Sequence, residues 1–502
     1  MSRVVSTNPA TGASRELDVD ETTTSDVRAL CQRASRAAAA YANKPLHWRA
    51  SMLGAMADEL ESRSSDLVEV AMNETALPKA RLEGELRRTA FQLRFFAGVI
   101  LDGAFLQASI DHATDSPMGP LPDLRRVRVP LGPVAVFGSS NFPFAFSVPG
   151  GDTASALAAG CPVVLKAHPA HPATSRATFE ALEAAATASG APPGVLGLVF
   201  GLDAGVALVE DPAIRAVGFT GSVAAGRALW QRANDRAVPV PFFGELGSAN
   251  PLVVTSGAAH ERAKEIGEGI AGSMTLGVGQ FCTKPGLLFV PKGVDGDELV
   301  ASLAGVLRDL SPMTMLSEGI AHHFGEGTRH IGAVEGVSHL VGGSSGDGTR
   351  VSAQLFEVDS DVFAGPLTTA LHEECFGPLG VVVRYRDTDD LRAALEDVQP
   401  ALTFSVFSAS NDADAAWLVE LARERAGRVI WNQFPTGVGV SWSMQHGGPW
   451  PSTTSPSATS VGASAIDRWL RPVTYQAFPA ELLPETLRDD NPLGVPQRVD
   501  GT

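Results

Sequence analysis

Two short segments of this sequence carry the side chains best suited to covalent chemistry. Glu245 lies between glycines in the run Phe243–Asn250, and Cys282 lies in the Gly-Gln-Phe-Cys-Thr-Lys-Pro run Gly279–Pro285. A cysteine thiolate attacks carbonyl carbons, and a nearby carboxylate can take a proton from the thiol or from water. The neighbouring glycines permit unusual backbone angles, which leave the Glu245 side chain room to change position. We therefore predict that this pair passes an acyl group through a thioester.

Asn141 is a third candidate for the same chemistry. It lies in a Gly-Ser-Ser-Asn-Phe-Pro turn directly after an apolar run, at the end of an expected strand. A side-chain amide there can donate a hydrogen bond to the oxyanion that forms on attack, which is worth roughly 3 kcal/mol in the transition state. A turn asparagine can instead satisfy its own backbone, and a lone cysteine or a turn glutamate can be purely structural. Cys161 and Cys375 have apolar or Gly/Pro neighbours and fit that structural role.

Lys166, Gly221 and Ser222 point to a nucleotide. Lys166 ends the apolar run 162–165, and a strand end in a parallel sheet borders the crevice where nucleotides bind. Ser222 follows Gly221 and opens an expected helix, whose N-terminus would face a pyrophosphate. The same Thr-Gly-Ser segment is also an ordinary helix cap, and Lys166 can be a simple surface residue.

The stretches that must position these residues alternate between short apolar runs and helices. This alternation predicts parallel Rossmann-like sheets and an α/β fold. Before them, helices are expected at 24–41, 48–72 and 81–101. The Ser/Thr/Pro-rich stretch 452–460 is expected on the surface. The expected strands are 134–137, 162–166, 195–200 and 216–220 in a first sheet, and 251–254, 287–290, 381–383 and 403–407 in a second.

The composition limits size, partners and compartment. With 502 residues, 44% of them hydrophobic and 19% charged, the chain predicts a globular protein of two or three domains. A net charge of -17 repels nucleic acid and anionic membranes, so neither is an expected partner. The four cysteines lack metal-ligand spacing, so we expect no metal, reduced thiols and a cytoplasmic location. No apolar run approaches the roughly 20 residues needed to span a bilayer.

The candidate segments resemble motifs of the aldehyde dehydrogenase superfamily. The similar segments are Glu-Leu-Gly at 245–247, the cysteine loop at 279–285, Asn-Phe-Pro at 141–143, Phe-Thr-Gly-Ser at 219–222 and Glu-Glu-x-Phe-Gly-Pro at 373–378. The resemblance implies an α/β fold with two Rossmann-like parallel-sheet domains and a small oligomerisation β arm. It places the cofactor-binding domain at 1–118 and 133–247 with part of 447–470, the catalytic domain at 248–446, and the arm at 119–132 and 471–490.

The resemblance also implies a role for each candidate residue in an NAD(P)-dependent oxidation of an aldehyde to a carboxylic acid. Cys282 is the nucleophile, Glu245 is the base that releases the thioester, and Asn141 stabilises the oxyanion together with the Cys282 backbone N–H. The implied cofactor contacts are Lys166 with the adenosine ribose, Gly221 and Ser222 with the pyrophosphate, Glu374 with the nicotinamide ribose, and Phe376 with the nicotinamide.

One departure from the common family pattern concerns the choice of cofactor. Many NAD-specific members carry a glutamate three residues after the strand-end lysine, where this chain has Pro169. The loss of that carboxylate removes a repulsion against a 2′-phosphate, and His168, His171 or Arg176 could favour one. We therefore expect NADP or NAD, with NADP slightly favoured.

The substrate expectation comes from the resemblance alone. The runs Asn432–Val438, His446–Pro451 and Arg471–Gln476 are similar to those of the 2-oxoglutarate semialdehyde (2,5-dioxopentanoate) dehydrogenases. An acidic aldehyde needs a basic anchor, and Arg88 or Arg94 in the expected helix 81–101 is a candidate, although a structural or solvated arginine fits equally well. NADP-dependent oxidation of medium- or long-chain fatty aldehydes is the alternative.

Two further alternatives belong to other functional classes. A cysteine hydrolase would use Cys282 with His446 as its base, but it leaves the strand–helix units and Lys166 without a purpose. A non-catalytic binding protein on the same scaffold would leave the whole set of catalytic residues unexplained. The expected partners are a small aldehyde and further copies of the chain in a homodimer or homotetramer.

Overall fold

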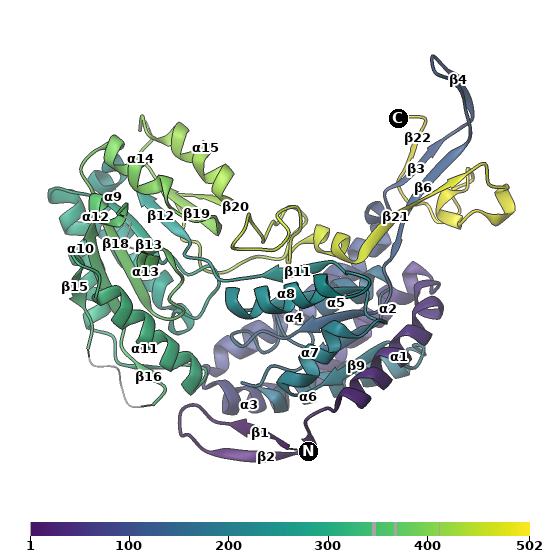
Figure 1. Cartoon of the computed structure of the whole chain (residues 1–502), viewed down its shortest axis with the longest axis horizontal. Coiled ribbons are helices and arrows are strands. Elements are labelled where there is room, and N and C mark those ends of the chain that lie inside the picture. The colour runs from purple at the N-terminus through teal and green to yellow at the C-terminus, as the bar shows by residue number, and fades with distance from the viewer. Residues whose placement is uncertain (1, 344–347, 366–368, 411) are drawn as a thin grey trace.

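Two parallel sheets with their helices lie side by side, and a slender β arm projects from one of them (Figure 1). The structure is a computed structural model and describes residues 2–343, 348–365, 369–410 and 412–502. None of the helices in these ranges is both long and apolar enough to cross a bilayer. The α/β fold with two Rossmann-like sheets, predicted from the sequence, is confirmed.

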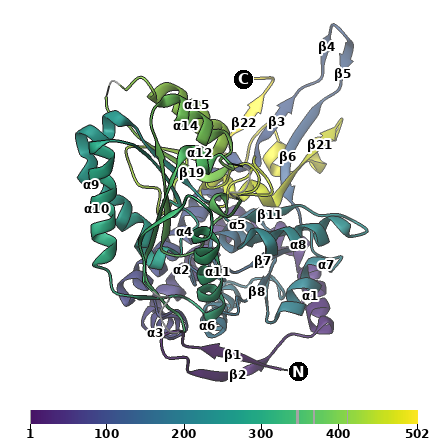
Figure 2. The same cartoon turned by 60° about the vertical axis from the view of Figure 1, so that its left-hand side comes forward.

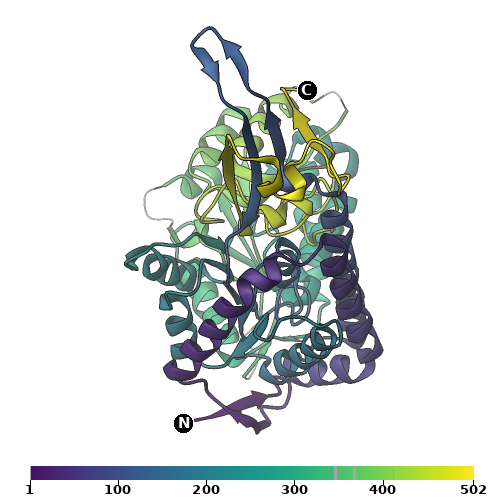
Figure 3. The same cartoon turned by 90° about the vertical axis from the view of Figure 1, so that its right-hand side faces the viewer.

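The chain begins with a hairpin and four helices that cover the first sheet. Figure 3 shows the hairpin at the end of the molecule opposite the arm. The stretch 48–72, predicted as one helix, is broken at Arg63, where neighbouring serines favour a helix end over a helix interior. These elements are β1 (Arg3–Thr7), β2 (Ser14–Asp20), α1 (Thr24–Ala42), α2 (Leu46–Ser62), α3 (Ser64–Thr75), α4 (Lys79–Asp102) and η1 (Ala104–Leu106).

The first sheet has five parallel strands in the order β11-β10-β7-β8-β9. The chain builds outward from β7 in one direction and then returns to its other side, which makes β7 and β10 the switch point where α/β sheets bind ligands. Its elements are β7 (Val134–Phe137), α5 (Gly151–Ala159), β8 (Val163–Lys166), α6 (Pro172–Ala188), β9 (Leu196–Val199), α7 (Leu202–Glu210), β10 (Ala216–Thr220), α8 (Val223–Asp235) and β11 (Phe242–Glu245).

The second sheet has seven strands in the order β15-β17-β18-β13-β12-β19-β20, and only β15 runs antiparallel to its neighbour. Its strands and helices are β12 (Pro251–Val254), α9 (Ser256–Thr275), β13 (Leu287–Pro291), α10 (Val294–Arg308), α11 (Glu318–Gly332), β15 (Ser338–Val341), β17 (Gln354–Asp359), α12 (Ser360–Phe363), α13 (Thr369–His372), β18 (Leu379–Tyr385), α14 (Thr388–Glu396), β19 (Ala401–Phe407), α15 (Ala415–Arg425) and β20 (Ala426–Trp431). A turn η2 (Leu276–Gly279) and a two-strand pair, β14 (Met313–Thr314) with β16 (Arg350–Val351), complete this part.

The arm is a four-stranded sheet in the order β21-β6-β3-β22, and its strands lie side by side in Figure 2. Two of these strands, β3 and β22, fall outside the predicted arm ranges 119–132 and 471–490. The predicted bounds of the domains stay a prediction. The arm contains β3 (Ala108–Asp111), β4 (Thr114–Ser116), β5 (Gly119–Leu121), β6 (Leu124–Pro130), β21 (Leu470–Gln476) and β22 (Gln497–Val499), with the turns η4 (Ala480–Leu482) and η5 (Glu485–Leu487). The turn η3 (Ala463–Trp469) precedes β21 and packs in the core of the first part.

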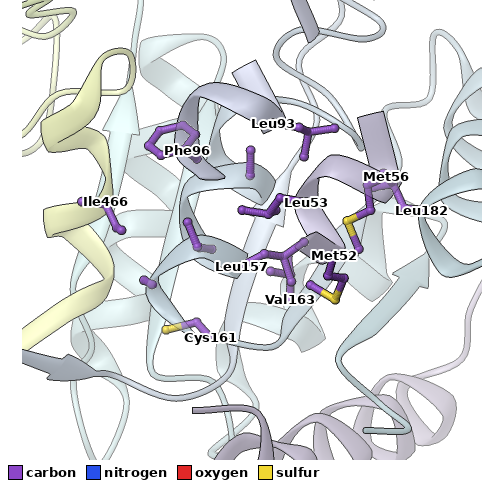
Figure 4. Packing of buried hydrophobic residues seen from close by; sticks show 14 of the residues in the cluster. Met52, Leu53, Met56, Leu93, Phe96, Leu157, Cys161, Val163, Leu182 and Ile466 are labelled. Atoms are coloured by element: carbon purple, nitrogen blue, oxygen red, sulfur yellow. The ribbon is translucent and has the colours of Figure 1, made fainter. Parts of the chain in front are cut away.

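The core of the first part packs α2 and α4 against α5 and the sheet (Figure 4). Leu53, Met56, Phe96 and Leu157 are fully buried there. Burying side chains of this size from two helices stabilises the fold by roughly 1.5–3 kcal/mol for each of them. This packing fixes α4 in place and therefore fixes which face of α4 is turned toward Cys282.

Candidate active site

The loop that carries Cys282 is held from two sides. Gly279 has a φ of +65°, and a Cβ there would lie 2.4 Å from the carbonyl of Gly377, so only glycine allows the segment 373–379 to approach. The buried ammonium of Lys284 donates to the carbonyls of Cys375 and Leu379 at 3.1 and 2.8 Å. The Cys282 loop and the predicted cofactor motif are thus fastened together.

Asn250 fixes the backbone of the nucleophile itself. Its side-chain amide donates to the carbonyl oxygens of Cys282 and Lys284 at 2.7 and 3.0 Å. Its carboxamide oxygen accepts hydrogen bonds from Ser248 and Thr403, and the residue adopts a left-handed φ of +47°. Asparagine tolerates this conformation better than most residues, so the site begins with a rigid cysteine loop.

The functional groups of Cys282, Glu245 and His446 meet at the junction between the two sheets. The Sγ of Cys282 lies 3.5 Å from Nε2 of His446, and the same nitrogen lies 3.1 Å from Oε1 of Glu245. The side chains of His446 and Glu245 are 0% and 4% exposed, whereas Cys282 is half-buried. Ser460 donates a hydrogen bond to the second carboxylate oxygen of Glu245. The structure therefore brings the predicted nucleophile and base together and adds an imidazole between them.

The electrostatics of this cluster keep the thiol protonated at rest. Burial, followed by the negative charges of Glu245 and Glu374, raises the pKa of the Cys282 thiol well above its usual range, while Arg428 acts in the opposite direction. Burial also acts to raise the pKa of Glu245, but the charge of His446 and hydrogen bonds from His446 and Ser460 outweigh it and lower that pKa. A carboxylate thus stands beside a neutral thiol, so attack requires removal of the thiol proton.

The same geometry argues against the hydrolase alternative. In a nucleophile–His–carboxylate triad, one ring nitrogen faces the nucleophile and the other donates to the carboxylate. Here Nε2 of His446 makes both contacts, and Nδ1 has no hydrogen-bond partner among the described residues. The carboxylate therefore does not orient the imidazole from behind, as such a triad requires.

Asn141 contacts the cysteine loop through its side-chain amide, and one of its two donors is engaged there. Its Nδ2 donates to the carbonyl of Gln280 at 2.9 Å, two residues before the nucleophile, and its own carbonyl accepts from Arg81 at 2.7 Å. A primary amide carries two N–H groups, so the second remains for an oxyanion. The role of Asn141 as an oxyanion donor stays a prediction.

The predicted cofactor residues line one side of the cluster. The carboxylate of Glu374 packs against Gly247, and a Cβ added to that glycine would lie 2.5 Å from the carboxylate. The same added Cβ would lie 3.4 Å from Val223, in the first turn of α8. Ser222 caps α8 by accepting a hydrogen bond from Ala225, which leaves the helix N-terminus next to Glu374. Burial raises the pKa of Glu374 to about 7. Gly221 precedes this cap, and Phe376 lies half-buried in the turn before β18.

Lys166 ends β8 as predicted and fits the ribose end of a nucleotide. Its side chain packs against Gly205 in α7, so closely that a Cβ added to that glycine would lie 3.5 Å from it. Among the described residues, no hydrogen bond to the Lys166 ammonium is found. Burial lowers the Lys166 pKa to about 8, and the charge of Glu21 acts against this. Glu21 packs over Gly201 at the start of α7, at the same edge of the sheet. An unpartnered buried amine beside a glycine is the kind of donor that a dinucleotide's ribose hydroxyls or phosphate would satisfy.

The two arginines predicted as substrate anchors lie on different faces of α4. Arg88 bonds to the Val438 carbonyl at 3.4 Å, and its pKa is lowered mainly by burial, with Cys282 and Glu245 among the charges that act on it. Arg94 instead pairs with Asp58 and Glu61 at 2.6 Å on an exposed surface, so the structure does not bring it to the cluster.

Arg428 is a second basic residue at the site, and it was not among the predicted residues. From β20 it donates to the carbonyls of Pro435 and Gly437, in the same loop that Arg88 reaches from the opposite side. Its charge lowers the pKa of the Cys282 thiol, although burial and two carboxylates outweigh that effect. Each guanidinium has five donors and uses only two in these bonds, so both can bind a further acceptor.

A sizeable cavity lies away from this chemistry. It has a volume of about 690 Å³ and runs along β9 between α1 and α6, with Arg33, Arg176 and Glu183 in its wall. It contains none of the clustered residues, so we place the active site at Cys282 on the geometry of its reactive atoms. A smaller pocket is lined by Glu245 and His446 together with Thr453 and Ser460.

The fold and the cysteine site agree with the chain's similarity to known proteins. Residues 2–473 match the aldehyde dehydrogenase family, and the chain belongs to that family, whose members are NAD(P)-dependent aldehyde oxidoreductases. The alpha-ketoglutaric semialdehyde dehydrogenase 2 of Azospirillum brasilense is 46% identical over 482 residues, which cover 95% of this chain and 91% of that protein. The alpha-ketoglutaric semialdehyde dehydrogenase of Acinetobacter baylyi is 40% identical over 485 residues, or 96% and 92%. Among solved structures, an NADP-dependent enzyme of E. coli has the same fold, with a TM-score of 0.80 and 24% identity over 94% of both chains.

Proposed function

We propose that this chain oxidises 2,5-dioxopentanoate (2-oxoglutarate semialdehyde) to 2-oxoglutarate with NAD(P) through a thioester on Cys282. The observation that carries the chemistry is the contact of Cys282 with His446 and, through it, with Glu245. The substrate is supported by the names of the two curated relatives and by two arginines beside the cluster. Those relatives do not favour the fatty aldehyde alternative.

The reaction begins with proton removal and attack. With its ring proton on Nδ1, His446 takes the thiol proton of Cys282 on Nε2, and the imidazolium that forms pairs with the Glu245 carboxylate through that nitrogen. The thiolate then forms a C–S bond to the aldehyde carbon. The former carbonyl oxygen becomes an oxyanion, which accepts hydrogen bonds from Asn141 and the backbone N–H of Cys282. NAD(P), which Lys166, Ser222 and Glu374 would hold, would supply the hydride acceptor, and loss of a hydride from the same carbon would leave the thioester.

The second half of the reaction is hydrolysis. Glu245 takes a proton from water, the resulting hydroxide attacks the thioester carbon, and the C–S bond breaks to release the carboxylic acid. The Cys282 thiolate takes back the proton held by His446, and Glu245 gives its proton to solvent. Ser460 holds the carboxylate, and the pocket lined by Glu245 and His446 leaves room for a water beside the base. The cycle returns every protein group to its starting protonation state.

Replacing Arg88 by alanine tests the substrate anchor. We expect the KM for 2,5-dioxopentanoate to rise roughly 10- to 100-fold, because a hydrogen bond to a charged group contributes about 1.5–3 kcal/mol. The KM for an uncharged aldehyde of similar length should stay within about twofold, since it has no carboxylate to lose. Steady-state kinetics with the two aldehydes measure this split.

Arg87 and Arg94 supply the matched controls on the same helix. Arg87 is exposed, and Arg94 pairs with Asp58 and Glu61, so neither Arg87→Ala nor Arg94→Ala should change the KM for the acidic aldehyde. Arg428→Ala should act like Arg88→Ala if both arginines bind the keto-acid end. An equal loss toward both aldehydes in Arg88→Ala would mean that the arginine merely supports the 435–438 loop.

The choice between NAD and NADP is proposed to depend on the charges around Lys166. The positive charge of Lys166 attracts a 2′-phosphate, and Pro169 carries no charge that would repel one, so both residues support NADP. The negative charge of Glu21 repels a 2′-phosphate and therefore acts against NADP. Glu21→Gln should therefore tighten NADP binding relative to NAD by up to about fivefold, the range of an exposed charge interaction. NADP affinity should also fall as the pH rises through about 8, because Lys166 then loses its proton.

Cofactor titration by protein fluorescence measures both dissociation constants without turnover. Glu16→Gln in the same hairpin is the control, because it removes an equal charge from an exposed position in β2. An unchanged NADP to NAD ratio in Glu21→Gln, together with an unchanged pH profile, would remove Glu21 and Lys166 from cofactor selection.

The substrate proposal as a whole is tested by initial rates of cofactor reduction with 2,5-dioxopentanoate and with a long-chain aldehyde, each with NAD and with NADP. We expect the highest kcat/KM with the dicarbonyl acid. A higher value with the long-chain aldehyde would leave the thioester chemistry intact and remove both the substrate and its arginine anchor. A cytoplasmic location and a homo-oligomer joined through the β arm are part of the same proposal.

A further inference from the structure

The three reactive side chains also have the composition of a metal site. One ligand atom from each of Cys282, Glu245 and His446 lies within 4.8 Å of the other two. Thiolate, imidazole and carboxylate are the three ligand types that zinc uses in proteins, and three protein ligands with one open position are typical of catalytic zinc sites. The sequence alone does not indicate this cluster, because His446 lies 164 positions from Cys282.

The distances between these ligand atoms agree with tetrahedral zinc. Zinc bonds of 2.3 Å to sulfur and about 2.05 Å to nitrogen at a tetrahedral angle place those ligand atoms about 3.6 Å apart. A nitrogen and an oxygen ligand come out about 3.4 Å apart on the same reasoning. The structure has 3.5 Å for Sγ to Nε2 and 3.1 Å for Nε2 to Oε1, so small side-chain movements suffice.

The residues around these three ligand atoms are compatible with a bound ion. Ser460 already holds the outer oxygen of Glu245, which is the role of an outer-shell partner in metal sites. His446 and Glu245 are buried, whereas the half-buried Cys282 leaves one side open to water. Thiolate and carboxylate together balance the charge of a divalent cation, and Arg88 and Arg428 are the nearby cations that oppose it.

We propose that Cys282, Glu245 and His446 form a reversible inhibitory site for a thiophilic divalent cation, with zinc as the best-fitting ion. Binding forms a metal–sulfur bond and releases the thiol proton to solvent, with no change in oxidation state. It would occupy the nucleophile and both groups that move protons, so a bound ion blocks the first step and the hydrolysis together. The inhibition rests on the proposed function, whereas the binding does not.

Titration with zinc alone tests the binding. Isothermal titration calorimetry on the unmodified chain should show one tight site, and cobalt added in its place should give the near-ultraviolet thiolate-to-cobalt band of a tetrahedral cysteine site. Ser460→Ala should weaken zinc binding by about 10-fold, the lower end for loss of an outer-shell partner. Magnesium should compete with neither ion, because it prefers oxygen ligands.

His446→Ala and Glu245→Ala decide whether all three residues are ligands. Each should lose the tight zinc site and the tetrahedral cobalt spectrum, which are read without any activity. The matched control is His260→Ala, an exposed histidine paired with Asp295 on α9, and it should bind zinc as the unmodified chain does. Unchanged zinc affinity in His446→Ala, or no thiolate–cobalt band in the unmodified chain, overturns the proposal.

Measurements of activity distinguish this inference from the proposed function. One equivalent of zinc should abolish aldehyde oxidation, and a chelator should restore it fully within the same sample. If the chain binds zinc tightly but does not oxidise any aldehyde, only the proposed function is contradicted. If aldehyde oxidation keeps its full rate with the site saturated by zinc, only the inhibitory role is contradicted.

Discussion

Cys282→Ala abolishes aldehyde oxidation, with an expected loss in kcat of at least about 10⁴-fold, as is found when a covalent nucleophile is removed from an enzyme. The reason is chemical: without Sγ there is no thioester, and His446 and Glu245 have no attacking group to deprotonate. Cofactor reduction with 2,5-dioxopentanoate measures the loss. The substitution is small and Cys282 is half-buried, so the fold should persist.

The matched control is Cys31→Ala. Cys31 is a fully buried cysteine in α1 and has no contact with the cluster, so this variant should keep its activity. Cofactor binding, measured by fluorescence, should be retained in Cys282→Ala and shows that the loss is chemical. A Cys282→Ala variant that keeps a measurable fraction of the original rate would contradict a thioester on this residue.

The residues that the sequence predicted correctly in position share one property. Glu245, Asn141 and Lys166 each follow or end a strand, and Cys282 lies between the turn η2 and the strand β13. All four lie within short runs whose glycines, prolines and apolar residues mark a local turn. Parallel strands bring their carboxyl ends to one edge of a sheet, so residues at those ends can be placed together without knowledge of distant contacts. Their catalytic and cofactor roles remain predictions, whereas the fold and the family are confirmed.

The residues that the sequence did not assign are positioned by long-range contacts. His446 reaches Cys282 from 164 positions away, and Ser460 reaches Glu245 from 215 positions away. The stretch 452–460 was predicted on the surface from its polar composition, and this is wrong for Ser452, Thr453, Thr459 and Ser460, which are buried. Their hydroxyls are bonded to backbone or to Glu245, and a polar group can be buried when its hydrogen bonds are made.

Helix geometry explains why Arg88 and Arg94 could not be separated by their types alone. Six residues along a helix with 3.6 residues per turn rotate the side chain by about 240°, so the two arginines must face different neighbours. Which of them faces the site depends on how α4 packs, and that is set by Leu93 and Phe96 in the core. The sequence predicts the helix, but only its packing selects Arg88.

Glu245→Gln separates the two halves of the reaction. We expect one equivalent of reduced cofactor per chain in a rapid first turnover, followed by a steady rate lower by about 10²–10⁴-fold, the contribution of a positioned general base. The glutamine keeps the shape of the side chain and a hydrogen bond with Ser460, but it cannot take a proton from water. Rapid-mixing absorbance measures the burst, and mass spectrometry of the intact chain detects the acyl group on Cys282.

His446→Ala is the matched comparison, because Nε2 of His446 contacts both partners. If the imidazole takes the thiol proton, its removal should slow the first turnover itself and give no burst, the opposite of Glu245→Gln. Hydroxylamine attacks a thioester without help from a base, so it should restore turnover in Glu245→Gln and not in His446→Ala. A Glu245→Gln variant without a burst would show that the carboxylate is already needed when the thiol is deprotonated, and Glu245 rather than His446 would then be the base for attack.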